Sequence, residues 1–437
     1  MRIVRQSRTM RSHHWEVLGG AIALVALGLT ACGAGGTGGT GAAGSDGAVR
    51  VLVEAGGHAE LQPVADAFEK ETGTKVTFVE LPYDGLYDRL SSELSSGAVS
   101  FDVAALDAIW LKNFSAGVKP LDDLFTPDAR SDLFPALLKE AEVDGSYVGM
   151  PVWTNAEILY YRKDLFDDPA NKQAFKARYG YDLAPPKTWQ QFSDTAQFFT
   201  RKGIYGTDVK GAVETEYLAT LMQAGAKDMV LSGDGNADID TPEALKALDF
   251  YSGLATRLKV SPAGAAQVDW AAAQNLYNQG KTAMMRFWAH AYTQIPAESP
   301  AKGKTGVTVL PAGPAGTAAV PGAWYLSIPK ATGNAAGAEK FVEFAFDHND
   351  LGVQTALGLA ARKSALQKYQ SKPGHENLGA LVAALDAPAT TPRPANAKWQ
   401  QIVDTVLVPM LQKSVAPGAD NAALLEDAQS KIEALLK

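Results

Sequence analysis

The chain has 437 residues, of which 46% are hydrophobic, 9% aromatic and 20% charged, a profile typical of a globular protein large enough for two or three domains. Its 40 lysines and arginines are outnumbered by 48 aspartates and glutamates, so we expect a surface that repels phosphate backbones and does not bind nucleic acid. The single cysteine, Cys32, excludes disulfides, cysteine-based metal sites and a thiol nucleophile in the folded body.

The N-terminal segment is typical of an exported protein. Residues 2–14 contain four arginines and no acidic residue, and residues 17–29 form an apolar run too short to span the ~30 Å core of a bilayer. The sequence Leu29-Thr-Ala-Cys32-Gly33 that follows resembles a bacterial lipobox, in which the cysteine receives a lipid and becomes the new N-terminus. We therefore expect a signal peptide over residues 1–31 and a lipidated Cys32. An ordinary signal peptide with a chance cysteine is the alternative.

Residues 32–47 are predicted to form a tether that begins at the lipidated cysteine. Positions 33–47 read GAGGTGGTGAAGSDG, a composition typical of a flexible linker with nothing to bury. A linker of this length spans roughly 20 Å on average. We expect it to hold the folded body close to the outer face of the membrane.

From residue 48 onward, short apolar runs alternate with amphipathic stretches of helical length. The pattern predicts strands at residues 49–53, 75–80 and 101–106. It predicts helices from residue 61 to near residue 73 and over residues 83–95. This β-α-β-α-β order indicates a parallel, doubly wound sheet.

The middle and the C-terminal part are predicted to be richer in helices. Thr188 and the pair Thr241-Pro242 are typical helix starts, and the last helix is expected over residues 421–437. Strand-like runs return in the second half of the chain. They are residues 282–288, 305–311 and 323–329.

The sequence contains no recognisable catalytic or metal-binding motif. The four histidines after the leader, His58, His290, His348 and His375, show neither HExxH nor i, i+4 spacing. No serine lies in a G-x-S-x-G elbow. We therefore expect a protein that is not an enzyme and that uses no metal and no cofactor.

Four of the eight tryptophans lie at the ends of predicted strands: Trp110, Trp153, Trp288 and Trp324. Open α/β sheets bind ligands beyond the carboxyl ends of their strands. A sugar presents a face of C–H groups and a rim of hydroxyls, which suits stacking on indole rings and hydrogen bonds to Asp, Glu, Asn and Arg. The pattern favours a carbohydrate site, and packing in the core is the competing role for each ring.

Eight short motifs resemble those of family 1 of the extracellular solute-binding proteins of ABC importers, a group that includes receptors for maltose, other oligosaccharides and polyols. The motifs occur in the family's order and cover nearly the whole chain after the leader. They are FEKETGTKV (68–76), DVAALD (102–107), YVGMPVW (147–153), ILYYRKDLF (158–166), PKTWQQF (186–192), GKTAM (280–284), PGAWYLSIP (321–329) and FVEFAF (341–346).

The resemblance implies the two-lobed, type II periplasmic-binding-protein fold. Each lobe would be an α/β unit with a doubly wound, mainly parallel sheet, and three crossovers would join the lobes. Lobe I would comprise residues 48–153 and 327–358, and lobe II residues 154–326 and 359–437. The ligand would lie in the cleft between the lobes, which close on it by a hinge motion.

The resemblance also implies a function. The chain would be a monomeric, lipid-anchored receptor at the outer face of the cell membrane, or in the periplasm, that captures a mono- or oligosaccharide or polyol. It would deliver this ligand to the permease subunits of an ABC transporter. The alternatives are a receptor for a glycerophosphodiester or a polyamine and, from another class, a surface lipoprotein enzyme that acts on glycans.

The resemblance places twelve residues in the ligand site. Trp288 and Trp324 are the expected stacking rings, and Asp107 is the expected acceptor of hydroxyls, with helix capping as its alternative role. Tyr83 and Glu214 open predicted helices and have packing and capping as alternatives. Two positions differ from maltose receptors, which carry a lysine at residue 58 and a glutamate at residue 155, and this argues against maltose itself. The twelve residues are Gly57, His58, Tyr83, Asp107, Trp153, Asn155, Glu214, Trp288, Trp324, Tyr325, Arg362 and Trp399.

Overall fold

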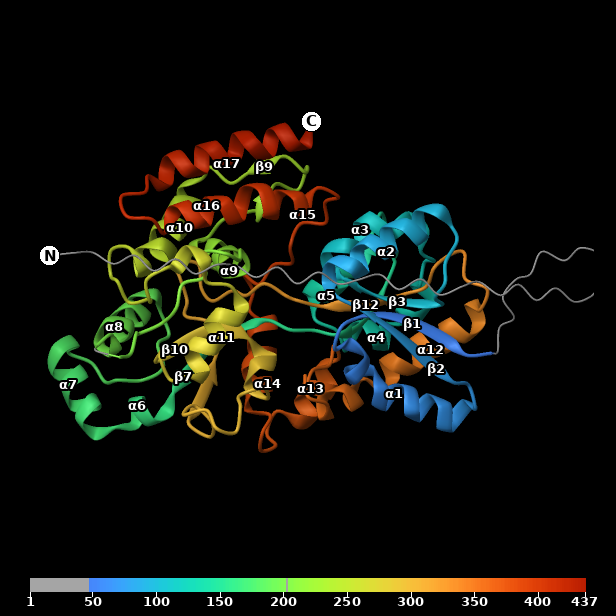
Figure 1. The fold of residues 1–437 in the computed structure, drawn as a ribbon, viewed down its shortest axis with the longest axis horizontal. Coiled ribbons are helices and arrows are strands. Elements are labelled where there is room, and N and C mark those ends of the chain that lie inside the picture. The colour runs from blue at the N-terminus through green and yellow to red at the C-terminus, as the bar shows by residue number, and fades with distance from the viewer. Residues whose placement is uncertain (1–46, 202) are drawn as a thin grey trace, which may run out of the picture. The chain divides into compact units, whose positions relative to one another are not determined.

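The computed structural model describes residues 47–201 and 203–437. The predicted signal peptide, Cys32 and positions 32–46 of the predicted tether lie outside these ranges. Within them, no helix combines the length and the apolar character needed to cross a membrane. The longer strands of the described part form two sheets, each packed with its own helices (Figure 1).

The first sheet has five strands in the order β2-β1-β3-β12-β6. β1 pairs in parallel with β2 and with β3, as the β-α-β-α-β pattern predicts, whereas β12 runs antiparallel between β3 and β6. The register places Trp324 opposite both Asp107 and Trp153, so the ends of three strands meet at one edge. The strands are β1 (Val49–Glu54), β2 (Val76–Leu81), β3 (Val103–Asp107), β6 (Met150–Trp153) and β12 (Trp324–Ser327).

Helices on this sheet follow the apolar spacing of the sequence. In α1 (Gly57–Thr72), Leu61, Val64 and Phe68 form a buried stripe, and the Phe68 ring packs on α12 (Ala335–Asp347). The helix ends at Gly73, whose φ of 73° is the left-handed conformation that glycine adopts without strain. Two hairpin strands and four more helices complete this part. They are β4 (Glu142–Val143), β5 (Ser146–Tyr147), α2 (Tyr83–Ser96), α3 (Leu111–Phe114), α4 (Pro127–Ser131) and α5 (Pro135–Ala141).

The second sheet has three strands in the order β10-β7-β11. β7 (Glu157–Arg162) lies in the centre, and both β10 (Met284–Trp288) and β11 (Thr305–Thr308) run antiparallel to it. This differs from the mainly parallel sheet expected for this lobe. Alternating apolar runs indicate that a strand exists but not its direction, because both kinds of pairing bury the same residues.

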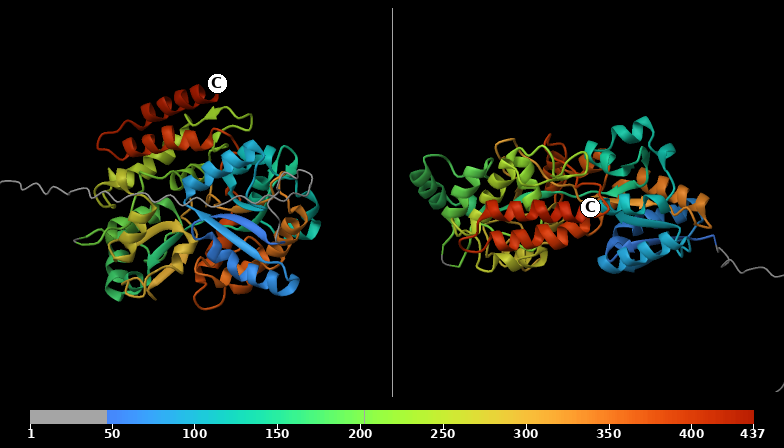
Figure 2. Two further views of the ribbon diagram at one scale, coloured as in Figure 1. Left: turned by 45° about the vertical axis from the view of Figure 1, so that its right-hand side comes forward. Right: turned by 90° about the horizontal axis from the view of Figure 1, so that it is seen from above.

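Helices far apart in the sequence pack together around this second sheet. Helices α16 (Val408–Ser414) and α17 (Asn421–Leu436) lie side by side next to α10 (Pro242–Ala255) (Figure 1, Figure 2). α10 begins after Thr241, whose side chain accepts a hydrogen bond from the amide of Ala244, as its N-capping role predicts. The other elements of this part are α6 (Lys163–Asp167), α7 (Pro169–Tyr179), α8 (Trp189–Phe199), α9 (Thr215–Ala224), β8 (Val230–Leu231), β9 (Ala237–Asp238), α11 (Trp270–Asn278), α13 (Lys363–Tyr369), α14 (Glu376–Leu385) and α15 (Trp399–Ile402).

The chain passes between the two sheets three times. It leaves β6 of the first sheet for β7 of the second, and it returns from β11 to β12. After α12, which packs on the first sheet, it reaches α14, which packs on β7 and β11. Segments from both sheets therefore meet in the region where these crossings lie side by side.

Candidate binding site

A cavity of about 590 Å³ lies between elements of the two sheets. Its volume falls within the range typical of small-molecule sites, about 300–1,000 Å³. Strand ends and helix starts supply most of its wall, which agrees with the general placement of ligands in α/β folds. The lining residues are Glu54, Tyr83, Asp107, Asn155, Glu214, Thr215, Trp270, Ala271, Gln274, Phe287, Trp288, His290, Gly322, Trp324 and Arg393.

Aromatic rings enter the cavity from both sheets. Trp324, the first residue of β12, packs on Trp153 with ring centroids 5.9 Å apart and on Trp110 at 5.7 Å. Trp288, the last residue of β10, packs on Trp270 at 5.5 Å. Since Trp110 and Trp153 are almost fully buried, they hold the Trp324 ring in place, and its remaining surface is available to a ligand.

Trp288 has room for its ring because the segment that returns from β11 to β12 carries a glycine, Gly322, beside it. A Cβ atom at Gly322 would lie 2.7 Å from the Trp288 ring, closer than nonbonded carbon atoms approach. Gly322 also donates its amide hydrogen to the carbonyl of Asn155 at 2.9 Å, which joins two of the crossings. The absence of a side chain at residue 322 therefore fixes where the indole lies.

Within the described part of the chain, the side chain of Asp107 has three partners in and beside the cavity wall. Its carboxylate accepts hydrogen bonds from the Tyr83 hydroxyl at 3.0 Å and from the amide of Ile109 at 3.2 Å. It also forms an ion pair with Arg393, Nη2 to Oδ1, at 3.1 Å. Helix capping, the alternative role predicted for Asp107, is thus present together with its position at the cavity. Arg393 precedes α15, which packs with the helices around the second sheet. The ion pair therefore links the end of β3 in the first sheet to the helices of the second.

Two further carboxyl groups line the cavity from different elements. Glu54 ends β1, and burial together with the negative charge of Asp107 raises its pKa to about 7. Glu214 precedes α9, and burial raises the pKa of its carboxyl as well. The Glu214 side chain does not cap the helix that it precedes.

Asn155 and His290 form a hydrogen-bonded pair in the wall. The Asn155 Nδ2 atom lies 2.7 Å from Nδ1 of His290, and its Oδ1 accepts from the amides of Ala156 and Ala289. Burial lowers the pKa of His290 to about 4, so the ring is neutral at pH 7. The Asn155 oxygen accepts from two amides, so the Asn155 nitrogen is the donor to His290. Nδ1 of His290 is therefore the acceptor, and the proton of the neutral ring is on Nε2.

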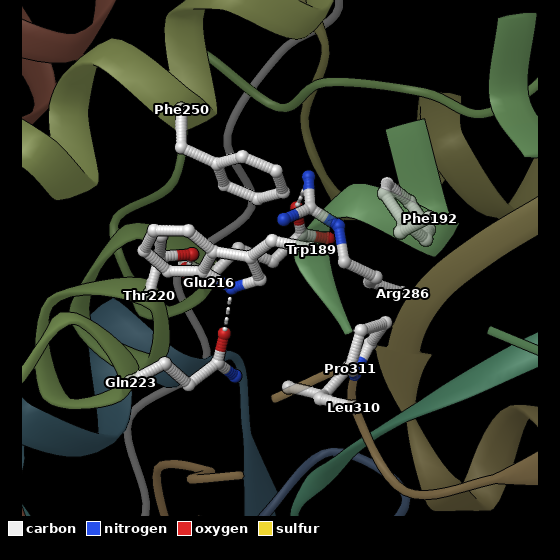
Figure 3. Close-up of a pocket in the computed structure, with 9 residues that line it drawn as sticks. All are labelled: Trp189, Phe192, Glu216, Thr220, Gln223, Phe250, Arg286, Leu310 and Pro311. Atoms are coloured by element: carbon white, nitrogen blue, oxygen red, sulfur yellow. Dashed lines mark hydrogen bonds and ion pairs between the residues drawn. The ribbon is translucent and has the colours of Figure 1, made fainter. Parts of the chain in front are cut away.

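A buried network of charges supports α9 next to the cavity. The Lys210 ammonium donates to Asp208 at 2.6 Å, to Glu216 and to the carbonyl of Arg286 at 2.7 Å. Arg286 pairs with Glu216 at 2.9 Å, and Figure 3 shows this pair beside the ring of Phe192. These contacts fix the first turn of α9.

The residues in Figure 3 line a second, almost closed cavity of about 10 Å³. That volume has room for about one water molecule, so this cavity is excluded as a site for a sugar-sized ligand. Among residues 47–201 and 203–437, no three histidine, cysteine, aspartate or glutamate side chains are grouped so that they would hold a metal ion.

Half of the twelve predicted site residues line the large cavity. The other six lie elsewhere, two of them behind its wall. Trp153 lies behind Trp324. Gly57 lies next to the Trp153 ring, since a Cβ atom at Gly57 would be 3.4 Å from that ring. His58 lies 3.4 Å from a Glu80 oxygen in a half-exposed position. The six that line the cavity are Tyr83, Asp107, Asn155, Glu214, Trp288 and Trp324.

Of the remaining three predicted residues, two have partners of their own and the third is buried, and none of them lines the cavity. The Tyr325 hydroxyl is buried and donates to Glu140 at 2.7 Å. Arg362 pairs with Asp132 at 2.7 Å. Trp399 opens α15 and is 1% exposed. The residues next to them in the sequence do not indicate that these three side chains lie away from the cavity.

The sequence analysis missed nine residues of the wall, and some of them had a usable signal. Glu54 ends the first predicted strand, so the rule that selected Asp107 applies to it equally. Arg393 lies in a proline-rich loop 286 residues from its partner, and no local pattern indicates that contact. The other missed residues are Thr215, Trp270, Ala271, Gln274, Phe287, His290 and Gly322.

The fold has two sheets, each packed with helices, three chain crossings between them and a cavity where they meet. This is the fold of the type II periplasmic binding proteins. The comparison with protein families agrees, because the model of the bacterial extracellular solute-binding proteins matches residues 54–349. The chain belongs to this family, which confirms the resemblance of the eight motifs. Its members are extracytoplasmic solute-binding proteins and not enzymes.

Individual relatives and structures support the same assignment. The chain is 28% identical to a probable ABC transporter-binding protein of Deinococcus radiodurans over 83% of its own length and 88% of the relative's. It is 27% identical to a maltooligosaccharide ABC transporter solute-binding lipoprotein of Streptococcus pneumoniae over 74% of each chain. A solute-binding protein of Thermotoga lettingae, solved with α-D-tagatose, matches with a TM-score of 0.73 and 26% identity over 89% of this chain and all of the other.

Proposed function

We propose that this protein is a receptor that captures a carbohydrate in the cavity and delivers it to the permease of an ABC transporter. The observation that carries the proposal is the pair of indole rings, Trp288 and Trp324, that enter one cavity from different sheets. The carboxyl and amide groups of Glu54, Asp107 and Asn155 line the same cavity. Ring faces suit the C–H face of a sugar, and the polar groups suit its hydroxyls.

The names of the relatives support a carbohydrate over the other solutes. The Streptococcus pneumoniae relative is named for maltooligosaccharides, and the Thermotoga lettingae structure holds a monosaccharide. A phosphodiester would require clustered cations, whereas Arg393 is the one lysine or arginine among the residues that line the cavity. The ligand class is therefore a sugar or polyol and not an anion.

Binding works by a shift between conformations. The first sheet supplies Glu54, Asp107 and Trp324, and the second supplies Trp288, so a sugar contacts all of them only when the two parts lie close together. A ligand that binds the closed state better shifts the equilibrium toward it. The permease then recognises the closed form. The parts that move are lobe I and lobe II. We place β12 (Trp324–Ser327) in lobe I, because it pairs with β3 and β6. Lobe I then comprises residues 48–153 and 324–358, and lobe II residues 154–323 and 359–437.

The proposal includes attachment to the membrane through a lipid on Cys32, after removal of residues 1–31, and action as a monomer. Lipidation and the Gly-rich tether would keep the receptor near its permease. Mass spectrometry of the N-terminal peptide tests this part: a diacylglycerol on Cys32 supports it, and an unmodified cysteine contradicts it.

A calorimetric screen tests the central proposal. The protein is titrated with monosaccharides, oligosaccharides, polyols, glycerophosphodiesters and polyamines, and the ligand is recovered and analysed. We expect saturable one-to-one binding of a sugar or polyol that is recovered unchanged. At a hundredfold its dissociation constant, that ligand should also raise the free energy of unfolding by about 2.7 kcal/mol. Binding confined to phosphodiesters or polyamines, or recovery of a cleaved sugar, would contradict the proposal.

A further inference from the structure

The large cavity holds more acidic groups than cations. Its wall contains the carboxyl groups of Glu54, Asp107 and Glu214, and Arg393 is the one lysine or arginine among the residues that line it. Arg393 is already paired with Asp107 at 3.1 Å. His290 adds no charge at pH 7, because burial lowers its pKa to about 4. Without a ligand, the negative charge of the wall is therefore not balanced from within the wall.

Glu54 is a carboxyl group of the wall that has no cation beside it. Within the described ranges, its side chain forms no hydrogen bond or ion pair with another side chain, and the charge that acts on it is the negative one of Asp107. A partly buried carboxylate is less favourable without an opposite charge than with one. The rise of its pKa to about 7, caused by burial and by Asp107, is the expected result of this position.

The aromatic rings that line the same cavity as Glu54 suit a cation as well as a sugar. Tyr83 and Trp324 lie on the side of the first sheet, their ring centroids 6.2 Å apart, and Trp288 with Trp270 lies on the other side. The faces of such rings attract ammonium groups, most strongly where water is excluded. A free carboxyl group beside aromatic faces is a combination that recognises a protonated amine.

This inference rests on the proposed function and makes its substrate class more specific. We propose that the ligand is a carbohydrate that carries a protonated amino group, and that this group binds at Glu54. The amine supplies the positive charge that the wall lacks, and the hydroxyls of the same sugar bind Arg393 and the Asn155–His290 pair. A sugar acid, which carries a negative charge, would be disfavoured beside Glu54 and Asp107.

Calorimetric titrations with matched sugars at pH 7.5 test the inference. Each series contains an amino sugar, its N-acetyl derivative and its hydroxyl parent, in the gluco, galacto and manno forms, together with the disaccharides of glucosamine and of N-acetylglucosamine. We expect the amine to bind at least tenfold more tightly than both neutral partners in one series. The preference should weaken as salt is raised, because the interaction is between charges.

Variants then separate the role of Glu54 from a general effect of charge. Glu54→Gln should lower the ratio of the affinity for the amine to the affinity for its neutral partners to about one, whatever it does to the affinity for the neutral partners. Glu69→Gln, at an exposed position of α1, changes the net charge equally and should keep the preference. A preference that survives in Glu54→Gln would overturn the inference.

The failure of the inference differs from the failure of the proposed function. Equal or tighter binding of the neutral sugars overturns the amine and leaves the carbohydrate receptor intact. Failure of every sugar and polyol, amine or neutral, overturns both.

Discussion

At the scale of single residues, the cavity depends on side chains that other side chains hold in place. Trp324 rests on two buried tryptophans, and Asp107 is fixed by Tyr83, Ile109 and Arg393. Groups fixed in this way lose little conformational entropy when a ligand arrives. The affinity of the site should therefore be concentrated in a few of them.

Replacing either cavity indole should weaken binding strongly. We expect Trp288→Ala and Trp324→Ala each to cost about 2 kcal/mol, or about thirtyfold in the dissociation constant, because buried tryptophans dominate many binding sites. Titration calorimetry with a sugar from the screen measures the loss.

Trp189→Ala is the matched control for the cavity tryptophans. Trp189 stacks on Phe250 with ring centroids 4.2 Å apart and lies outside the cavity. Its loss should change stability but leave the dissociation constant within about twofold. Equal losses of affinity in all three variants would mean that the rings act through the fold and not by contact.

Stability should depend on pH through Glu140. Burial raises the pKa of this carboxyl to about 8 in the folded protein, above its ordinary value of 4.5. Between these values the folded state holds a proton that the unfolded state has released, so the free energy of unfolding falls as the pH rises from about 5 to above 8. In Glu140→Gln, thermal unfolding measured over that range should show a flatter fall.

Glu69→Gln serves as the reference for the pH experiment, since this residue is exposed. It should keep the slope of the unmodified protein. If Glu140→Gln retains the full slope, Glu140 does not hold the proton that its burial implies.

Part of the site was predictable from the sequence at this scale. Asp107, Trp288 and Trp324 end or begin strands, and the rule that α/β sheets bind ligands at strand ends selects them. The same rule covers Glu54. Arg393 was not predictable, because its contact with Asp107 depends on how the chain returns to the cavity and not on any nearby residue.

At the scale of elements, the sequence pattern predicted the strands β1, β2, β3, β10, β11 and β12, the helices α1, α2 and α17, and the starts of α8 and α10. It did not predict β6 and β7 or helices such as α7 and α11. The direction of β10 and β11 was not predictable, since a strand that is buried on both faces has the same pattern in either direction. The inward direction of Tyr325 and Trp399, both almost fully buried, was likewise open, because their neighbours in the sequence do not indicate it.

The segment between β11 and β12, which carries Gly322 next to Trp288, allows a test of how the backbone fixes the position of the indole. Gly322→Ala would place a Cβ atom 2.7 Å from the Trp288 ring, so the ring or the strand must move. We expect affinity to fall tenfold or more, while the free energy of unfolding falls by about 1–3 kcal/mol, the usual cost of overpacking. Calorimetry and denaturant unfolding measure the two effects.

Gly333→Ala is the control for the Gly322→Ala variant, because a Cβ at Gly333 has no atom within 4 Å. It should leave both affinity and stability nearly unchanged. Unchanged affinity in Gly322→Ala would contradict the role of that glycine in placing the indole.

At the scale of the whole molecule, both sheets contribute residues to one binding surface. The family assignment and the fold agree with this arrangement, and the carbohydrate, the amine and the movement of the lobes are proposals built on it. The fold was predictable because eight motifs in order restrict the topology, whereas the ligand was not, because it depends on a few side chains that the crossings bring together.

A crystal structure of the protein with the sugar selected by the screen is the decisive measurement. We expect an intact sugar between Trp288 and Trp324, with hydroxyls on Asp107 and Asn155. A sugar bound outside this cavity, or a cleaved product within it, would refute the proposed receptor.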